Sequence, residues 1–154
     1  MQTVQFGTNW FPDTATIDTR ISGNVNMQDV ISWEESLHHA LAQIPDHGEF
    51  RIMIDLFGFK AIDFEAHKRF RTVIPLTLSH YGWKVGYVNL FDEHANAIHY
   101  SNTRGIRCFA AAHAHQDETK IGLYERSYSR TDEHYFTDPV EARKWLARIQ
   151  SPSK

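Results

Sequence analysis

The sharpest chemical pattern in the sequence is a pair of histidines, His113 and His115, followed by Asp117. On a strand, residues two apart point to the same face, so both imidazoles could converge on one metal ion. Asp117 or His134 would supply a third ligand. These four residues define a metal-binding protein or a metal-dependent hydrolase as one hypothesis. The alternative is a strand end that carries two hydrogen-bonded histidines.

The elements around this pattern decide between the two interpretations. Segment 106–115 is predicted to be a buried strand, although its three consecutive alanines also favour a helix. In a helix the two imidazoles would point about 200° apart, which argues against a shared metal. A helix over 117–128 and a short strand over 133–136 are expected to follow. Asp138 and Pro139 then mark the start of the last helix.

The centre of the predicted sheet is the segment 51–57, which is apolar on both faces. Such a run is typical of a central strand covered on both sides. Asp55 and Gly58 close it, and a helix capped by Asp63 is expected to run to about residue 80. Pro75 inside that helix is expected to kink or end it.

The remaining elements complete an alternating pattern of strands and helices. Residues 3–11 and 14–22 are predicted to form a hairpin, and an amphipathic helix begins after Asn26. A further strand is predicted over 84–91. Residues 92–105 are polar and are expected to be a long loop or to include a short strand around 98–100. The simplest prediction is one domain over residues 1–150, followed by a frayed tail over 151–154.

Composition excludes several classes of function. A net charge of −3 gives no reason to expect a nucleic-acid partner. The single cysteine, Cys108, has no second cysteine to pair with, and no apolar run approaches the ~20 residues of a membrane span. The N-terminus lacks the features of a signal peptide, so a cytoplasmic protein is expected. No phosphate-binding loop or nucleophile elbow is present, and we expect no cofactor.

Two stretches resemble a known family. The central strand reads IMIDLFGF and the end of the chain reads YFTDPVEARKWLA, and both are similar to the SpoIIAA-like or STAS-like family of small bacterial α/β domains. The resemblance implies a mixed sheet with helices packed mainly on one face, over residues 1–150. The residues that match the family's ending are Phe136, Asp138, Glu141, Ala142, Trp145 and Leu146.

The resemblance implies two different roles. Some members are anti-sigma-factor antagonists that are switched by phosphorylation of a serine at the start of the second helix. Here the corresponding turn, residues 58–63, contains no serine or threonine, so the switch does not carry over. The other branch resembles a shortened CRAL-TRIO lipid-binding fold, and this sequence fits that branch better.

We therefore expect a binding or regulatory module without catalytic activity of its own, whose partner is a protein or a small apolar molecule. Ligands of α/β sheets bind at strand ends, which is where the loop after the central strand falls. A structural homodimer is a third hypothesis. The residues predicted to bind the ligand or partner are Asp55, Phe57, Gly58, Phe59, Lys60 and Asp63.

Overall fold

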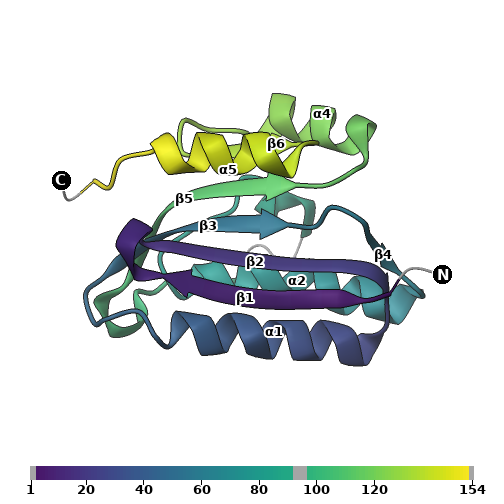
Figure 1. The fold of residues 1–154 in the computed structure, drawn as a ribbon, viewed down its shortest axis with the longest axis horizontal. Coiled ribbons are helices and arrows are strands. Elements are labelled where there is room, and N and C mark those ends of the chain that lie inside the picture. Colours follow the sequence, from purple (N-terminus) through teal and green to yellow (C-terminus); the bar gives the residue numbers. More distant parts are fainter. Residues whose placement is uncertain (1–2, 92–96, 153–154) are drawn as a thin grey trace.

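The computed structural model describes residues 3–91 and 97–152, which form a mixed sheet flanked by helices (Figure 1). The strands are β1 (Gln5–Phe11), β2 (Thr16–Val25), β3 (Glu49–Asp55), β4 (Phe59–Ala61), β5 (Arg107–Ala114) and β6 (Glu133–Phe136). The helices are α1 (Met27–Leu41), α2 (Phe64–Ser79), α4 (Glu118–Tyr128) and α5 (Pro139–Arg148). Short 3-10 turns are η1 (Pro12–Thr14), η2 (Val88–Phe91) and η3 (Thr103–Gly105).

The sheet is ordered β1-β2-β3-β5-β6, and β4 extends it by pairing with β2. Strands β1 and β2 form an antiparallel hairpin. The neighbours from β2 to β6 all pair in parallel, with helices in the crossover connections. The carboxyl ends of β3, β5 and β6 therefore meet at one edge of the sheet.

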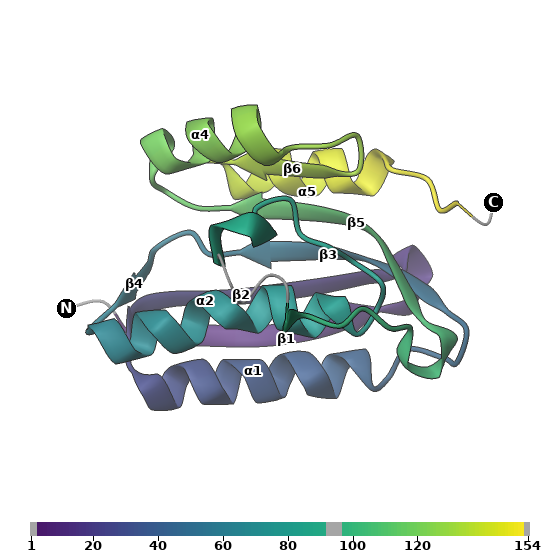
Figure 2. The ribbon, with the colours of Figure 1, turned by 180° about the vertical axis from the view of Figure 1, so that it is seen from behind.

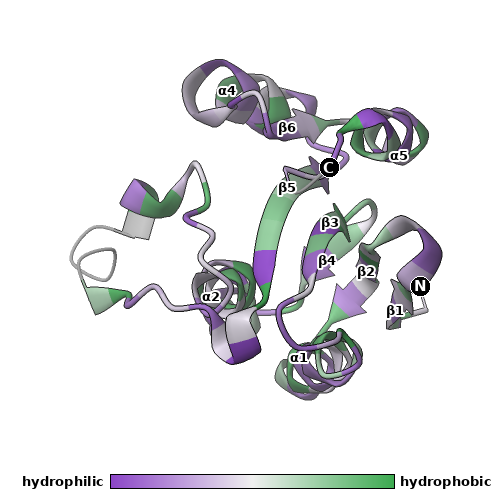
Figure 3. Cartoon of the chain, turned by 90° about the vertical axis from the view of Figure 1, so that its left-hand side faces the viewer, coloured by the Kyte–Doolittle hydropathy of each residue, from purple (hydrophilic) through white to green (hydrophobic). Residues whose placement is uncertain are grey.

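Helices cover both faces of this sheet, with two on one side and one on the other. Helices α1 and α2 lie on one face, as the view from behind shows (Figure 2), and α5 lies on the opposite face. The end-on view shows α4 beside β6, with β5 hydrophobic along most of its length (Figure 3). On β3, Ile52 and Ile54 join the core under α1 and α2, while Met53 joins the core under α5. This explains why both faces of the central strand are apolar.

Capping residues set the start of each long helix. The side chain of Asn26 accepts a hydrogen bond from the amide of Asp29, whose own side chain bonds back in a capping box. Asp63 and Asp138 cap α2 and α5 in the predicted positions. Helix α2 does not end at Pro75 but continues to Ser79.

The structure corrects the prediction for residues 84–91 and describes only part of residues 92–105. The predicted strand over 84–91 is wrong: Val88 donates to the carbonyl of Val85 at 3.1 Å, and the chain forms the η2 turn. Both valines are buried, and a spacing of three suits a 3-10 turn. Within 92–105, residues 92–96 lie outside the described part, and 98–100 form no strand.

The C-terminal tail is partly held against the sheet. Ser151, in the tail that was expected to fray, is buried and its hydroxyl contacts the Glu49 carboxylate on β3. Residues 153–154 lie outside the described part. Over residues 3–91 and 97–152, the helices are too short or too polar to cross a membrane.

Candidate functional site

A cavity of about 250 Å³ opens at the carboxyl ends of the parallel strands β3 and β5. It is enclosed by α2, α4 and the turn η2, and we call it the carboxyl-edge pocket. Open α/β sheets bind ligands in this position because the strand ends and the following loops leave a crevice there. The residues that line it are Ile54, Leu56, His67, Phe70, Arg71, Ile74, Tyr87, Leu90, His113, Ala114, His115, Lys120, Ile121, Tyr124 and Tyr135.

The wall of the pocket is apolar. Phe70 and Ile74 are four residues apart on α2, so they present one helical face to the cavity. Ile54 on β3 and Ile121 on α4 are buried and face the same space from the sheet and from the crossover helix. The wall therefore offers a surface that an apolar molecule would cover.

The base of the pocket contains a buried pair formed by His113 and Glu133. His113 Nε2 lies 2.8 Å from Glu133 Oε2. Glu133 Oε1 accepts hydrogen bonds from the Gly86 amide at 2.9 Å and from Arg130 Nη2 at 2.6 Å. Burial alone would raise the pKa of Glu133, but the bonds from His113, Arg130 and Gly86 outweigh it and hold the pKa below its ordinary value. Glu133 is thus an anion at neutral pH, and His113 donates to it.

Tyrosine rings pack around this histidine. The Tyr135 ring stacks on His113 with centroids 4.6 Å apart, and Tyr87 meets His113 edge-on at 5.7 Å. Burial raises the pKa of Tyr87 and Tyr135, so both phenols stay protonated. The Tyr135 hydroxyl is buried and has no hydrogen-bond partner in the described part of the chain. Tyr124 belongs to the same aromatic group, because its ring centroid lies 5.4 Å from that of Tyr87.

Besides His113, four basic side chains line the pocket: His67, Arg71, His115 and Lys120. We call these four residues the basic rim. Burial lowers the pKa of His67, and the positive charges of Lys120 and Arg71 lower it further. Burial and Lys120 also lower the pKa of His115, against a smaller opposing effect of Asp117. Among the described residues that line the pocket, none is acidic.

The predicted metal cluster does not form. His113 and His115 do line one pocket, as expected of residues two apart. The carboxylate of Asp117, however, caps α4 by accepting from the Lys120 amide at 3.0 Å. His134 belongs to the opposite face of β6, where its ring meets Trp145 at 4.8 Å. Over residues 3–91 and 97–152, no group of three His, Cys, Asp or Glu side chains could hold a metal ion.

The loop predicted to bind the ligand begins with residues that have structural partners. Asp55 accepts from the Phe57 amide at 3.1 Å and from Arg143 Nη2 at 3.0 Å. Gly58 has a φ of +89°, which favours glycine, and its amide donates to Gln116 Oε1 at 2.7 Å. Phe57 is half exposed. These contacts hold the loop against the end of β5.

The rest of that loop supports the pocket from outside. Phe59 is buried and stacks on Phe70 at 3.9 Å, so it stands behind the pocket wall. Lys60 is exposed on β4, and Asp63 caps α2 by accepting from the Ala66 amide at 2.8 Å. Leu56, which lies between the predicted residues Asp55 and Phe57, lines the pocket itself.

Sequence reasoning identified His115 but missed the other three residues of the basic rim. His67 and Arg71 are four residues apart on the predicted second helix, which was a usable signal that they share a face. Lys120 comes from a helix about 50 residues away in the chain. No local pattern could place it beside them.

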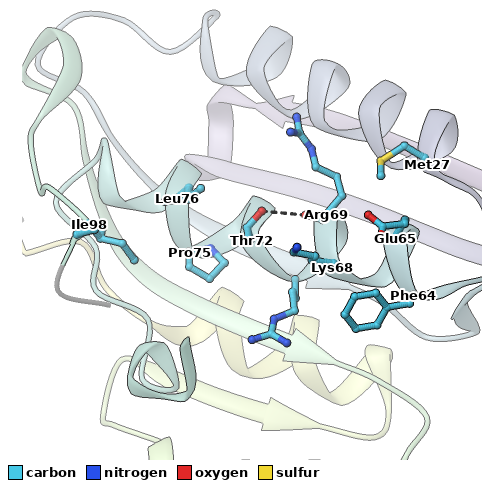
Figure 4. Close-up of a pocket in the computed structure, with 11 residues that line it drawn as sticks. Met27, Phe64, Glu65, Lys68, Arg69, Thr72, Pro75, Leu76 and Ile98 are labelled. Atoms are coloured by element: carbon cyan, nitrogen blue, oxygen red, sulfur yellow. Dashed lines mark hydrogen bonds between the residues drawn. The ribbon is translucent and has the colours of Figure 1, made fainter. Parts of the chain in front are cut away.

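A second hollow of about 540 Å³ runs along the outer side of α2 (Figure 4). Phe64, Lys68, Thr72 and Leu76 follow one another along the helix, and Ile98 approaches from the loop on the other side. Ile98 and its neighbour Ala97 come directly after residues 92–96, which lie outside the described part. The carboxyl-edge pocket lies at the carboxyl ends of β3 and β5, where open α/β sheets bind ligands, and is the stronger candidate.

Among the comparisons with known proteins, the one with solved structures bears on the fold. No protein-family model matches the sequence, and no curated protein sequence matches it. Among solved structures, the chain is similar to an uncharacterised protein of the DUF3478 family with a SpoIIAA-like fold from Shewanella loihica PV-4. The TM-score is 0.54 at 15% sequence identity, and the match covers 95% of this chain and 98% of that one.

This likeness confirms the fold that the resemblance implied. The chain has a SpoIIAA-like fold: a mixed sheet with helices on its faces and a final helix docked against β3 and β5. At this level of identity the likeness concerns the fold alone. Function has to be argued from the pocket.

Proposed function

We propose that this protein is a non-catalytic binding domain that holds a small, largely apolar molecule in the carboxyl-edge pocket. The observation that carries the proposal is the apolar cavity of about 250 Å³ at the carboxyl ends of β3 and β5. Small-molecule sites are typically concave, mostly apolar and placed at such strand ends. Since residues 58–63 contain no serine or threonine, the binding role does not involve the family's phosphorylated serine.

The chemistry of the lining supports binding over catalysis. The described lining includes no serine, threonine or cysteine that could act as a nucleophile. The imidazole of His113 could serve as a base, but its Nε2 is bonded to Glu133. The pair thus stabilises the base of the pocket, and the tyrosine rings around it add apolar surface.

Binding of neutral probes tests this function. Indole and cinnamamide would be titrated into ¹⁵N-labelled protein, with amide chemical shifts followed by NMR. We expect saturable shifts at Leu56, His115 and Ile121, and weaker binding when Leu56→Trp fills the pocket. Leu123→Trp is the control, because Leu123 lies on α4 but is exposed and outside the lining. Unsaturable or scattered shifts, or equal binding by both variants, would contradict the proposal.

A second candidate function is self-association through an exposed apolar group next to the same edge. Phe57, Ile62 and Phe64 are 48%, 57% and 71% exposed, and a second copy of the chain could cover them. Sedimentation equilibrium tests this candidate. It predicts a concentration-dependent dimer that Phe64→Ser disrupts, whereas a monomer at all concentrations would exclude it.

A further inference from the structure

The charged side chains described in the lining of the carboxyl-edge pocket are basic, and the anionic Glu133 lies behind His113, paired with it and with Arg130. The described lining contains the basic rim and no aspartate or glutamate. The whole chain has the opposite balance, with 16 Lys and Arg against 19 Asp and Glu. Within the basic rim, Arg71 and Lys120 carry the positive charge at neutral pH, because the lowered pKa of His67 and of His115 favours the neutral form of both imidazoles there.

The basic rim is assembled from three separate elements. His67 and Arg71 come from α2, Lys120 comes from α4, and His115 follows the end of β5. They are close enough to act on one another: the charge of Lys120 lowers the pKa of both His67 and His115. Burial lowers the pKa of Lys120 because it disfavours the charged ammonium, and an anion placed beside that ammonium would offset the cost.

The position of Lys120 suits such a contact. Its ammonium lies 5.7 Å from the centroid of the Tyr124 ring, which also lines the pocket. The nearby Asp117 carboxylate caps the helix and is not part of the lining. Within the described residues, no carboxylate forms an ion pair with Lys120. An ammonium in this setting is available to a ligand.

We propose that the ligand of this pocket is a small apolar carboxylic acid, bound as its anion. Its hydrocarbon part lies against Ile54, Phe70 and Ile121, and its carboxylate lies at the basic rim beside Lys120. This inference rests on the proposed binding function and names its ligand class. A cavity of about 250 Å³ is smaller than the ~300–1,000 Å³ of drug-sized sites, so an acid of modest size fits it.

Matched acid and amide pairs test the charge directly. Binding of cinnamate and cinnamamide, and of octanoate and octanamide, would be measured by calorimetry with the full chain. The members of each pair share their hydrocarbon part and differ in charge. We expect the acid of at least one pair to bind about tenfold more tightly than its amide, and this advantage to shrink as salt is added.

Variants then assign the effect to Lys120. Lys120→Met is expected to weaken acid binding about tenfold and to leave amide binding unchanged. Lys144→Met is the matched control, because Lys144 is an exposed lysine on α5, across the sheet. Lys120→Gln is a second neutral variant, and equal thermal midpoints confirm that the folds are intact.

Each outcome has a distinct meaning. If amides bind as tightly as their acids, the inference is wrong and the proposed binding function stands. If no member of any pair binds, both are wrong. If inorganic phosphate displaces the acid but neither amide binds, the pocket is a general anion site, and the apolar part of the inference is overturned. Acid binding that Lys120→Met leaves unchanged also overturns it.

Discussion

His113 and Glu133 meet across two neighbouring parallel strands, with Nε2 and Oε2 2.8 Å apart, although the two residues are 20 positions apart in the sequence. In the register of β5 and β6, His113 lies opposite Tyr135 and Ala111 lies opposite Glu133. Glu133 is thus the diagonal neighbour of His113 on the same face of the sheet. The pair links β5 at the base of the pocket to the edge strand β6. The Gly86 amide and the Arg130 guanidinium donate hydrogen bonds to the same carboxylate from neighbouring loops.

The first prediction concerns this carboxylate. Glu133→Gln keeps the shape of the side chain but removes the charge that His113 and Arg130 contact. We expect the free energy of unfolding to fall by about 2–3 kcal/mol, measured by urea denaturation at neutral pH. Asp132→Asn is the control, because Asp132 lies 3.8 Å from Arg130 in an exposed pair worth at most about 1 kcal/mol. Equal losses in the two variants would contradict the assigned role of Glu133.

The second prediction is a loss of stability in mild acid. The folded-state pKa of His67 and of His115 lies below the ordinary value of 6.5, so the unfolded chain binds protons first. Stability is therefore unaffected above about pH 6.5 and decreases as the pH falls through the lowered pKa values.

Urea midpoints measured from neutral to mildly acidic pH check this prediction. The groups that face these histidines are Lys120 and Arg71 for His67, and Lys120 and Asp117 for His115. Replacing both histidines by glutamine is expected to flatten the pH dependence in that window. An unchanged slope would show that other groups cause it.

The third prediction separates the two phenylalanines that flank Gly58. Phe59 is buried and stacked on Phe70, so Phe59→Ala is expected to lower the free energy of unfolding by about 3–4 kcal/mol. Phe57 is 48% exposed, and Phe57→Ala is expected to cost less than about 0.5 kcal/mol. Chemical denaturation measures both. A large loss for Phe57→Ala would mean that the loop contributes to the core.

The fourth prediction concerns a close backbone approach at the pocket. A Cβ on Gly86 would lie 2.2 Å from the Tyr128 carbonyl oxygen, so the loop before η2 would have to move away from α4. Gly86→Ala is expected to destabilise the fold by about 2–3 kcal/mol and to weaken probe binding, because the neighbouring Tyr87 lines the pocket.

Gly7→Ala provides the control for that variant. Gly7 lies in β1 with nothing within 4 Å of an added Cβ, so alanine there is expected to be neutral or to stabilise by about 0.5 kcal/mol. Thermal unfolding compares the two. Similar destabilisation by both substitutions would mean that the contact with Tyr128 is not the cause.

The sequence predicts most of this fold because the decisive signals are local. The caps at Asp63 and Asp138 and the apolar run in the central strand depend only on neighbouring residues, and the structure confirms them. The strand predicted over 84–91 is wrong because it, too, was inferred from local signals alone. Its apolar residues suit a strand, but Val85 and Val88 reach the core through a 3-10 turn that only tertiary packing selects.

The pocket was harder to predict because it depends on contacts between distant segments. The sequence pointed to the correct edge of the sheet and to His113 and His115, which do line one cavity. It could not pair His113 with Glu133, since this requires the register of two strands joined by a helix. Likewise, Lys120 joins the basic rim only because α4 and α2 line the same cavity.

Arg143 on α5 bonds Asp18 on β2 and Asp55 on β3, and 125 residues separate it from Asp18. During synthesis, both carboxylates and the apolar face around Met53 leave the ribosome long before α5 does. That face stays uncovered until α5 emerges and docks, which is a period in which nascent chains can associate wrongly. Completion of this domain therefore waits for translation of its last helix.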